Sequence, residues 1–261
     1  MKTIIKNILL VSAMALPLAS CSDFLDKEPL DKGTEAIVFK TPQQFEQAAN
    51  ALYNTEGWKN YENKANYGNM DRGLDISGLG SNGGGSAPES NFQWDKPYGH
   101  IRTCNILLQK AEEYSGDPSG IAQSVGTAYF FRAWQHFYLL SVFGGVPIVD
   151  RVLDVTDGSV LFGPRKSRYE VAHFIISDLE KAIPMLPKES TIAENAKGKV
   201  SQEAAQAFLA RVLLYEATWE KYVPSIDYDL DGGGSNVGAG TAKPEGYYSI
   251  EKMLTEAKRL S

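Results

Sequence analysis

The sequence predicts an all-α fold built from repeated helix pairs, and two observations carry this prediction. Residues 126–149 place apolar side chains at helical spacing on two adjacent faces, as expected for a helix packed between neighbours. The same pattern returns 77 positions later, within residues 201–222. The matching positions are Ala128 and Ala205, Phe131 and Phe208, Ala133 and Ala210, and Tyr138 and Tyr215.

The helices that precede each copy also match one another. Leu108-Gln-Lys-Ala111 corresponds to Leu179-Glu-Lys-Ala182, and Leu254-Thr-Glu-Ala257 opens a third version near the C-terminus. Two helix types therefore alternate, and small alanines with large aromatics at fixed offsets are typical of tetratricopeptide-like helix pairs. The usual period of such repeats is about 34 residues, whereas the two copies here lie 77 positions apart. The chain is therefore expected to be a tetratricopeptide-like helical repeat array with long loop insertions.

Residues 1–20 are predicted to be a lipoprotein signal peptide. Lys2 and Lys6 form its positive end, and residues 8–18 are an apolar run too short to span a membrane comfortably. Leu18-Ala-Ser-Cys21 then follows the order of a bacterial lipobox. We expect Cys21 to be lipidated and to anchor the chain. The alternative is ordinary secretion, with Cys21 next to the cleavage site by chance.

Cysteine usage and charge exclude several classes of function. A lipidated Cys21 leaves only Cys104, on an apolar helical stripe, so a disulfide framework and a cysteine-based zinc site are excluded. Without its leader the chain has 24 basic and 32 acidic residues, a formal charge of −8, and nucleic-acid binding is not expected. Residues 21–40 are acidic and unpatterned, as in a tether.

One helical domain is predicted over residues 41–261. Thr41-Pro-Gln-Gln44 opens its first helix with a capping box. The paired helices are then expected at 98–113 and 119–143, from Ser167-Arg-Tyr-Glu170 to the prolines at 184 and 187, and at 201–222. Periodicity is absent from 56–96 and from 218–246, and such long loops favour function or flexibility.

The last helix, residues 250–260, has no following partner in this sequence. Its apolar stripe is Ile250, Met253, Leu254 and Ala257. The array is therefore expected to be truncated at its C-terminus, with this stripe left in water and the helix frayed.

Catalytic and metal chemistry have weak support in the sequence. No nucleophile motif or distinctive carboxylate pair occurs, and the three histidines lack the i, i+4 partners of a metal site, so an enzyme is not expected. Asp227, Asp229 and Asp231, followed by Gly232, match the first half of a calcium loop. Position 12 of that loop is Gly238 instead of glutamate, so a polar turn without a bound ion is the alternative. No resident cofactor is expected, apart from this possible calcium.

Several motifs together resemble the SusD/RagB family of outer-membrane lipoproteins. They are Cys21-Ser-Asp-Phe-Leu-Asp-Lys-Glu-Pro, Phe131-Arg-Ala-x-x-x-Phe-Tyr-Leu-Leu-x-x-Phe-Gly-Gly-Val-Pro, Ser167-Arg-x-Glu-Val, Asp178-Leu-Glu-Lys-Ala-Ile-Pro-Met-Leu-Pro and Gly198-Lys-Val-Ser. Members of the family are usually longer, and their C-terminal half carries part of the ligand site. The resemblance therefore implies that this chain is an N-terminal portion.

The resemblance also implies a function. It implies a cell-surface protein, held on the outer membrane by its lipid, that captures a glycan or other nutrient for a TonB-dependent, SusC-like transporter. Trp94 lies where family members contribute a stacking aromatic, and we expect Asn91, Asp71 and Arg72 to bind ligand beside it. Packing of the loop onto the helices is the alternative role for Trp94. The rival function is a structural or adhesive surface lipoprotein that binds only protein partners.

Overall fold

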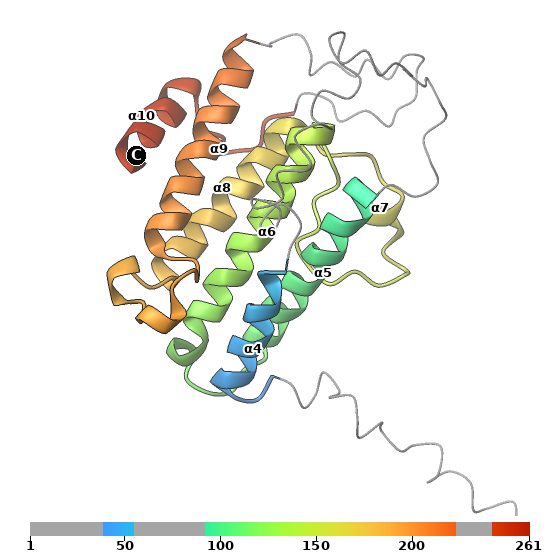
Figure 1. Cartoon of the computed structure of the whole chain (residues 1–261). Helices are drawn as coiled ribbons and strands as arrows, with labels where there is room; N and C mark the ends of the chain where they lie inside the picture. The colour runs from blue at the N-terminus through green and yellow to red at the C-terminus, as the bar shows by residue number, and fades with distance from the viewer. Residues whose placement is uncertain (1–38, 55–91, 223–241) are drawn as a thin grey trace, which may run out of the picture.

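A computed structural model of the chain describes residues 39–54, 92–222 and 242–261. Every regular element in these three ranges is helical, which confirms the predicted all-α class (Figure 1). The elements are α4 (Pro42–Leu52), α5 (Phe92–Glu112), η4 (Pro118–Ile121), α6 (Ala122–Phe143), α7 (Gly158–Leu161), α8 (Arg168–Met185), η5 (Glu189–Thr191), η6 (Glu194–Ala196), α9 (Gln202–Tyr222) and α10 (Ile250–Leu260). Among the described helices, none combines the length and the apolar character needed to cross a membrane.

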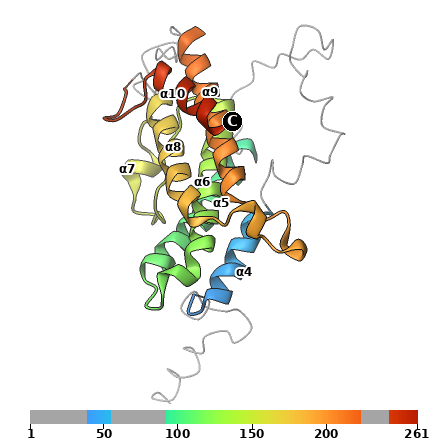
Figure 2. The ribbon, with the colours of Figure 1, turned by 90° about the vertical axis from the view of Figure 1, so that its left-hand side faces the viewer.

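The long helices pack in the order in which they occur along the chain. Helix α5 contacts α6, α6 contacts α8, α8 contacts α9, and α9 contacts α10. Figures 1 and 2 show them side by side, with α4 covering α5 and α6. The predicted alternation of two helix types is therefore present as a tetratricopeptide-like stack.

Helix α6 is the centre of this stack, as its two apolar faces predicted. Phe130, Ala133 and Leu140 of α6 are buried, and the helix packs against α4, α5 and α8. A Cβ atom at Gly126 would come within 2.9 Å of the Met185 side chain, so glycine permits the close approach of α6 and α8. The helix ends before Gly144, whose positive φ of +72° is a conformation that glycine adopts without steric cost.

Both predicted capping boxes are present. In the first, the Thr41 hydroxyl accepts from the Gln44 backbone while the Gln44 side chain accepts from the Thr41 backbone. The second joins Ser167 and Glu170 at the start of α8 in the same way, over 2.8 and 3.0 Å. These local signals place the two helix starts correctly because each cap involves only four consecutive residues.

One helix boundary differs from the prediction. Helix α5 begins at Phe92, six residues before the expected start at Tyr98, and contains Pro97. Helix α8 contains Pro184 and ends at Met185, between the two prolines that were predicted to end it. Both helices accommodate an internal proline, although its missing N–H removes one hydrogen bond to the preceding turn.

The expectation that the whole apolar stripe of α10 lies in water is wrong. Met253 is fully buried and Ala257 is 7% exposed, because α10 packs directly on α9. Leu254, on the outer side, is 36% exposed. The stripe is thus split between a covered and an open side, and fraying of this helix stays a prediction.

Candidate functional site

Three side chains follow one another along one face of α5 and line a groove. Trp94, Tyr98 and Arg102 are spaced by four residues, which puts them one above the other on successive turns. The Trp94 ring lies 5.2 Å from the Tyr98 ring and meets Phe143 of α6 edge-on at 5.1 Å. The groove is therefore bordered on this side by two aromatic rings and a guanidinium group.

The opposite wall is the irregular segment 147–161, which follows α6 and includes α7. The groove between this wall and α5 has a volume of about 320 Å³. The wall contributes the side chains of Pro147, Val149, Arg151, Leu153, Asp154, Val155, Val160 and Leu161. An aromatic and aliphatic lining with a few charged groups is the composition expected of a small-molecule site.

Side chains of α5 and α6 hold this wall by its backbone carbonyl groups. Five hydrogen bonds do so: Tyr98 Oη donates to Pro147 O (2.9 Å), Asn105 Nδ2 to Val149 O (3.0 Å) and Arg151 O (2.9 Å), Arg132 Nη1 to Asp150 O (2.8 Å), and Arg102 Nη1 to Leu153 O (3.0 Å). Because the wall has little secondary structure of its own, these bonds satisfy carbonyl groups that a helix or sheet would otherwise pair. The groove is thereby preorganised before any ligand enters.

Arg132 is itself fixed in the core. Its guanidinium donates to both Asp178 oxygens, at 2.7 and 2.8 Å, and to Asn105 Oδ1 at 2.7 Å. Burial opposes a charge at this position, yet the bonds to Asp178 hold the pKa of Arg132 above its ordinary value. The wall is therefore tied to a charged pair that spans α6 and α8.

The acidic side chains of the wall are engaged within their own turn. Asp154 Oδ1 accepts from the backbone and hydroxyl of Thr156, and these bonds lower the pKa of Asp154. Asp157 accepts from the Asp154 backbone and from Arg151, each at 2.7 Å, and its pKa is lowered for the same reason. Both carboxylates stay ionised at neutral pH, and Arg151 is paired.

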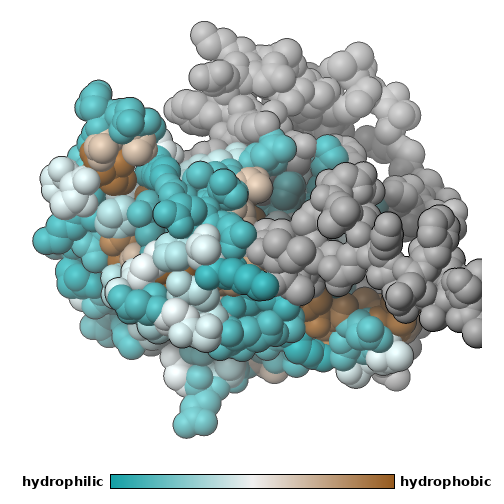
Figure 3. Space-filling model, turned by 90° about the horizontal axis from the view of Figure 1, so that it is seen from below, coloured by the Kyte–Doolittle hydropathy of each residue, from teal (hydrophilic) through white to brown (hydrophobic). Residues whose placement is uncertain are grey.

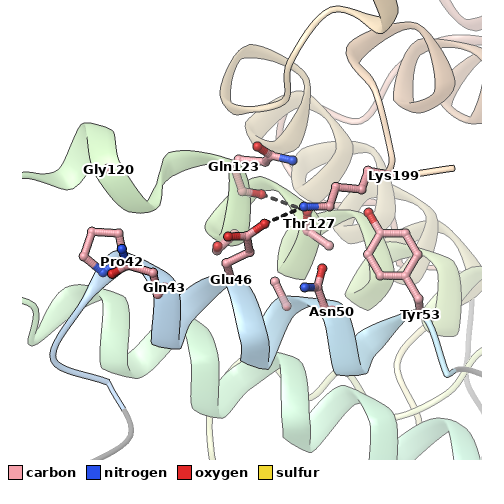
Figure 4. Close-up of a pocket in the computed structure, with 11 residues that line it drawn as sticks. Pro42, Gln43, Glu46, Asn50, Tyr53, Gly120, Gln123, Thr127 and Lys199 are labelled. Atoms are coloured by element: carbon pink, nitrogen blue, oxygen red, sulfur yellow. Dashed lines mark hydrogen bonds and ion pairs between the residues drawn. The ribbon is translucent and has the colours of Figure 1, made fainter. Parts of the chain in front are cut away.

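A second pocket lies between α4 and α6 (Figure 4) and has a different character. Its volume is about 220 Å³, and Lys199 reaches across it to Glu46 at 2.5 Å. Tyr53, its one aromatic, uses its hydroxyl to accept from Val200 N and packs its ring against Phe131. Seen from below (Figure 3), the described surface is mostly hydrophilic, with apolar residues in small separate areas. The groove along α5 is the better candidate site because two aromatic rings line it.

Of the expected site residues, Trp94 lies in the described part of the chain and lines the groove. The other residues expected to be lipidated, to bind ligand or to bind calcium lie outside the described ranges and stay sequence predictions. They are Cys21, Asp71, Arg72, Asn91, Asp227, Asp229 and Asp231. Sequence reasoning missed Tyr98, Arg102 and the wall, although the four-residue spacing from Trp94 was a usable signal for the first two.

The described residues contain no group of three or more metal-binding side chains. Cys104 is fully buried, as predicted, and burial raises the pKa of its thiol to about 12. His136 is also fully buried, and its Nδ1 lies 2.9 Å from the Arg132 carbonyl oxygen. Burial, with a smaller effect of the Arg132 charge, lowers the pKa of His136 to about 4. Both residues belong to the core and not to the groove.

Comparisons with known proteins agree in pointing to one family. The model of the SusD-like family described as "Starch-binding associating with outer membrane" matches residues 23–214. A SusD-like protein from Bacteroides ovatus is 27% identical over an alignment of 250 positions, which covers 86% of this chain and 42% of the relative. The chain spans about two-fifths of the length of the curated relatives it matches.

Solved structures show the same fold. A SusD-like protein from Bacteroides fragilis superimposes with a TM-score of 0.56 at 27% identity, over 76% of this chain and 40% of the other. A laminarin-binding SusD-like protein gives a TM-score of 0.55 at 22% identity, over 78% and 47% of the two chains. These matches confirm that the tetratricopeptide-like stack of this chain is that of SusD-like proteins.

Proposed function

Because this chain belongs to the SusD-like family, we propose that it binds a glycan in the groove between α5 and residues 147–161. The observation that carries this proposal is the aromatic pair of Trp94 and Tyr98 along one side of that groove. Aromatic faces stack on the apolar C–H side of a sugar ring, and nearby polar groups bind its hydroxyls. Arg102, Arg151 and Asp154 are the polar groups of this groove.

The preorganised wall supports a binding role. Ordering a flexible loop when a ligand binds would cost affinity, and the five bonds to wall carbonyl groups remove much of that cost. A wall that serves only to pack the helices would not need an open groove beside it. The described charges form no arrangement that singles out an acid and a nucleophile, so we propose binding and not catalysis.

The cellular setting is part of the same proposal. The lipobox supports a lipid anchor at Cys21, and the family description names the outer membrane. We propose that the protein is held on the outer surface of the outer membrane and passes its glycan to a SusC-like, TonB-dependent transporter. Since the chain spans part of its relatives' length, segments of a longer protein would complete the ligand site.

A glycan array tests this function directly. The full chain with Cys21→Ala, which removes the lipid site, is screened against plant, algal, fungal and mucosal glycans. We expect binding to a small set of related glycans. Binding to none of them, together with capture of an outer-surface protein, would favour the structural or adhesive function instead.

A further inference from the structure

The groove contains one cationic group that forms no ion pair with a described carboxylate. Arg102 is exposed, lines the groove, and forms one hydrogen bond there, from Nη1 to Leu153 O. We propose that Arg102 binds a carboxylate or sulfate group of the glycan, so that the groove selects acidic glycans. This inference rests on the proposed function and names the ligand class for that site.

Four other described arginines are paired with a carboxylate, whereas Arg102 is not. Arg132, Arg151, Arg168 and Arg259 each form an ion pair with a carboxylate, at 2.7 to 2.8 Å. Within residues 39–54, 92–222 and 242–261, no carboxylate forms such a pair with Arg102. Its positive charge therefore faces the groove without a described counter-ion.

The acidic side chains near the groove do not act as a counter-ion for Arg102. Asp154 lines the groove, but its Oδ1 accepts two hydrogen bonds from Thr156. Asp157 is occupied by Arg151 and by the backbone of Asp154. Turn formation thus holds both carboxylates to their own loop, and Arg102 is left to meet an external acceptor.

The position of Arg102 fits a glycan that stacks on the aromatic rings. It follows Tyr98 by about 6 Å and Trp94 by about 12 Å along the helix axis. A sugar chain lying along α5 would therefore bring a substituent of a neighbouring unit to the guanidinium. The bond to Leu153 O fixes one edge of the group, and the fixed wall positions that carbonyl in turn.

The chemistry of guanidinium favours an anion over a hydroxyl. Arginine has five N–H donors in a planar fork and no acceptor, which matches a group that only accepts hydrogen bonds. An anionic acceptor also adds the attraction between opposite charges to a hydrogen bond that the ionised guanidinium already strengthens. A carboxylate or sulfate only accepts hydrogen bonds and carries a negative charge, whereas a sugar hydroxyl also donates and is neutral.

Matched ligands and matched variants test the inference. Affinities of the full chain with Cys21→Ala are measured for oligogalacturonate and its methyl ester, and for chondroitin sulfate and its desulfated form. These pairs keep the sugar backbone and remove a carboxylate charge or a sulfate. Arg102→Ala is compared with Arg211→Ala, which removes an exposed arginine of α9 that does not line the groove.

We expect at least one of these oligosaccharides to bind tenfold or more tightly than its form without the carboxylate charge or the sulfate, and this ratio to weaken with salt. Arg102→Ala should bring the ratio close to one, and Arg211→Ala should leave it largely unchanged. An array that finds only neutral glycans would overturn the inference while the proposed function stands. A charge preference that survives Arg102→Ala would also overturn it, and binding of no glycan at all would remove the proposed function as well.

Discussion

Arg132 of α6 and Asp178 of α8 form a buried ion pair through two hydrogen bonds, of 2.7 and 2.8 Å. Their side chains are 5% and 0% exposed. The same guanidinium donates to the backbone of Asp150, in the wall of the groove. One pair therefore links the packing of two core helices to the shape of the candidate site.

Asp178→Ala is expected to lower the free energy of unfolding by about 3–5 kcal/mol, because it leaves the buried charge of Arg132 without its partner. Urea unfolding measures this loss. Released from Asp178, Arg132 should also hold Asp150 less firmly, so hydrogen exchange should become faster in residues 147–153 of the folded protein.

The second buried pair is the matched control. Arg168 of α8 and Glu216 of α9 lie 2.8 Å apart with 3% and 0% exposed side chains, away from the groove wall. Glu216→Ala should lower stability by a similar amount without a specific increase of exchange in 147–153. Equal exchange changes in that segment for both variants would show that the Arg132 pair has no particular connection to the wall.

The buried imidazole of His136 predicts a loss of stability in mild acid. Its pKa of about 4 in the folded protein lies below its usual 6.5, so between these values the unfolded chain binds a proton that the folded chain does not. The resulting loss of unfolding free energy is absent above about pH 6.5. It grows as the pH falls towards 4, where it reaches about 3 kcal/mol. Urea unfolding at pH 7 and pH 4.5 should show a clearly smaller pH dependence for His136→Gln. An identical pH dependence in the two proteins would contradict the assignment.

Cys104 is expected to be chemically inert in the folded protein. Its thiol is fully buried and its pKa is about 12, so almost no thiolate exists at pH 8. In the Cys21→Ala variant, where Cys104 is the single cysteine, a disulfide reagent should react slowly before unfolding and rapidly in urea. Rapid reaction of the folded protein would show that this part of the core opens readily.

Anchoring is predicted from Leu18-Ala-Ser-Cys21. Cells that express the chain should incorporate labelled palmitate into it, and Cys21→Ala should abolish the label and release the protein from the membrane fraction. Ser20→Ala, which keeps a small residue before the cysteine, is the control and should remain labelled. Label that persists in Cys21→Ala would contradict the lipobox assignment.

Much of the fold was predictable because its signals are local. The capping boxes at Thr41 and Ser167 and the glycine stop at Gly144 each depend on a few consecutive residues. The early start of α5 was missed because a proline such as Pro97 usually occupies the first turn of a helix. The burial of Met253 was missed because the helix that covers this side chain is α9, which precedes α10 in the chain.

The groove was predictable only through Trp94. Its wall is irregular and carries no periodic pattern, and the residues that hold it are far away in sequence. Asn105 lies 44 positions before Val149, and Arg132 lies 46 positions before Asp178. Nothing in one sequence distinguishes these polar residues from the many others that face solvent. Their roles follow from the stacking of α5, α6 and α8, which the helix pattern predicts only in outline.

The central claim is that the aromatic side of the groove binds glycan, and Trp94→Ala tests it most directly. Calorimetric titration with the glycan that the array identifies is compared for the unsubstituted protein, Trp94→Ala and Trp219→Phe, the last of which changes an aromatic that packs on Arg168 away from the groove. We predict that Trp94→Ala weakens binding tenfold or more, about 1.4 kcal/mol, while Trp219→Phe binds normally. Unchanged affinity of a folded Trp94→Ala protein would contradict the claim.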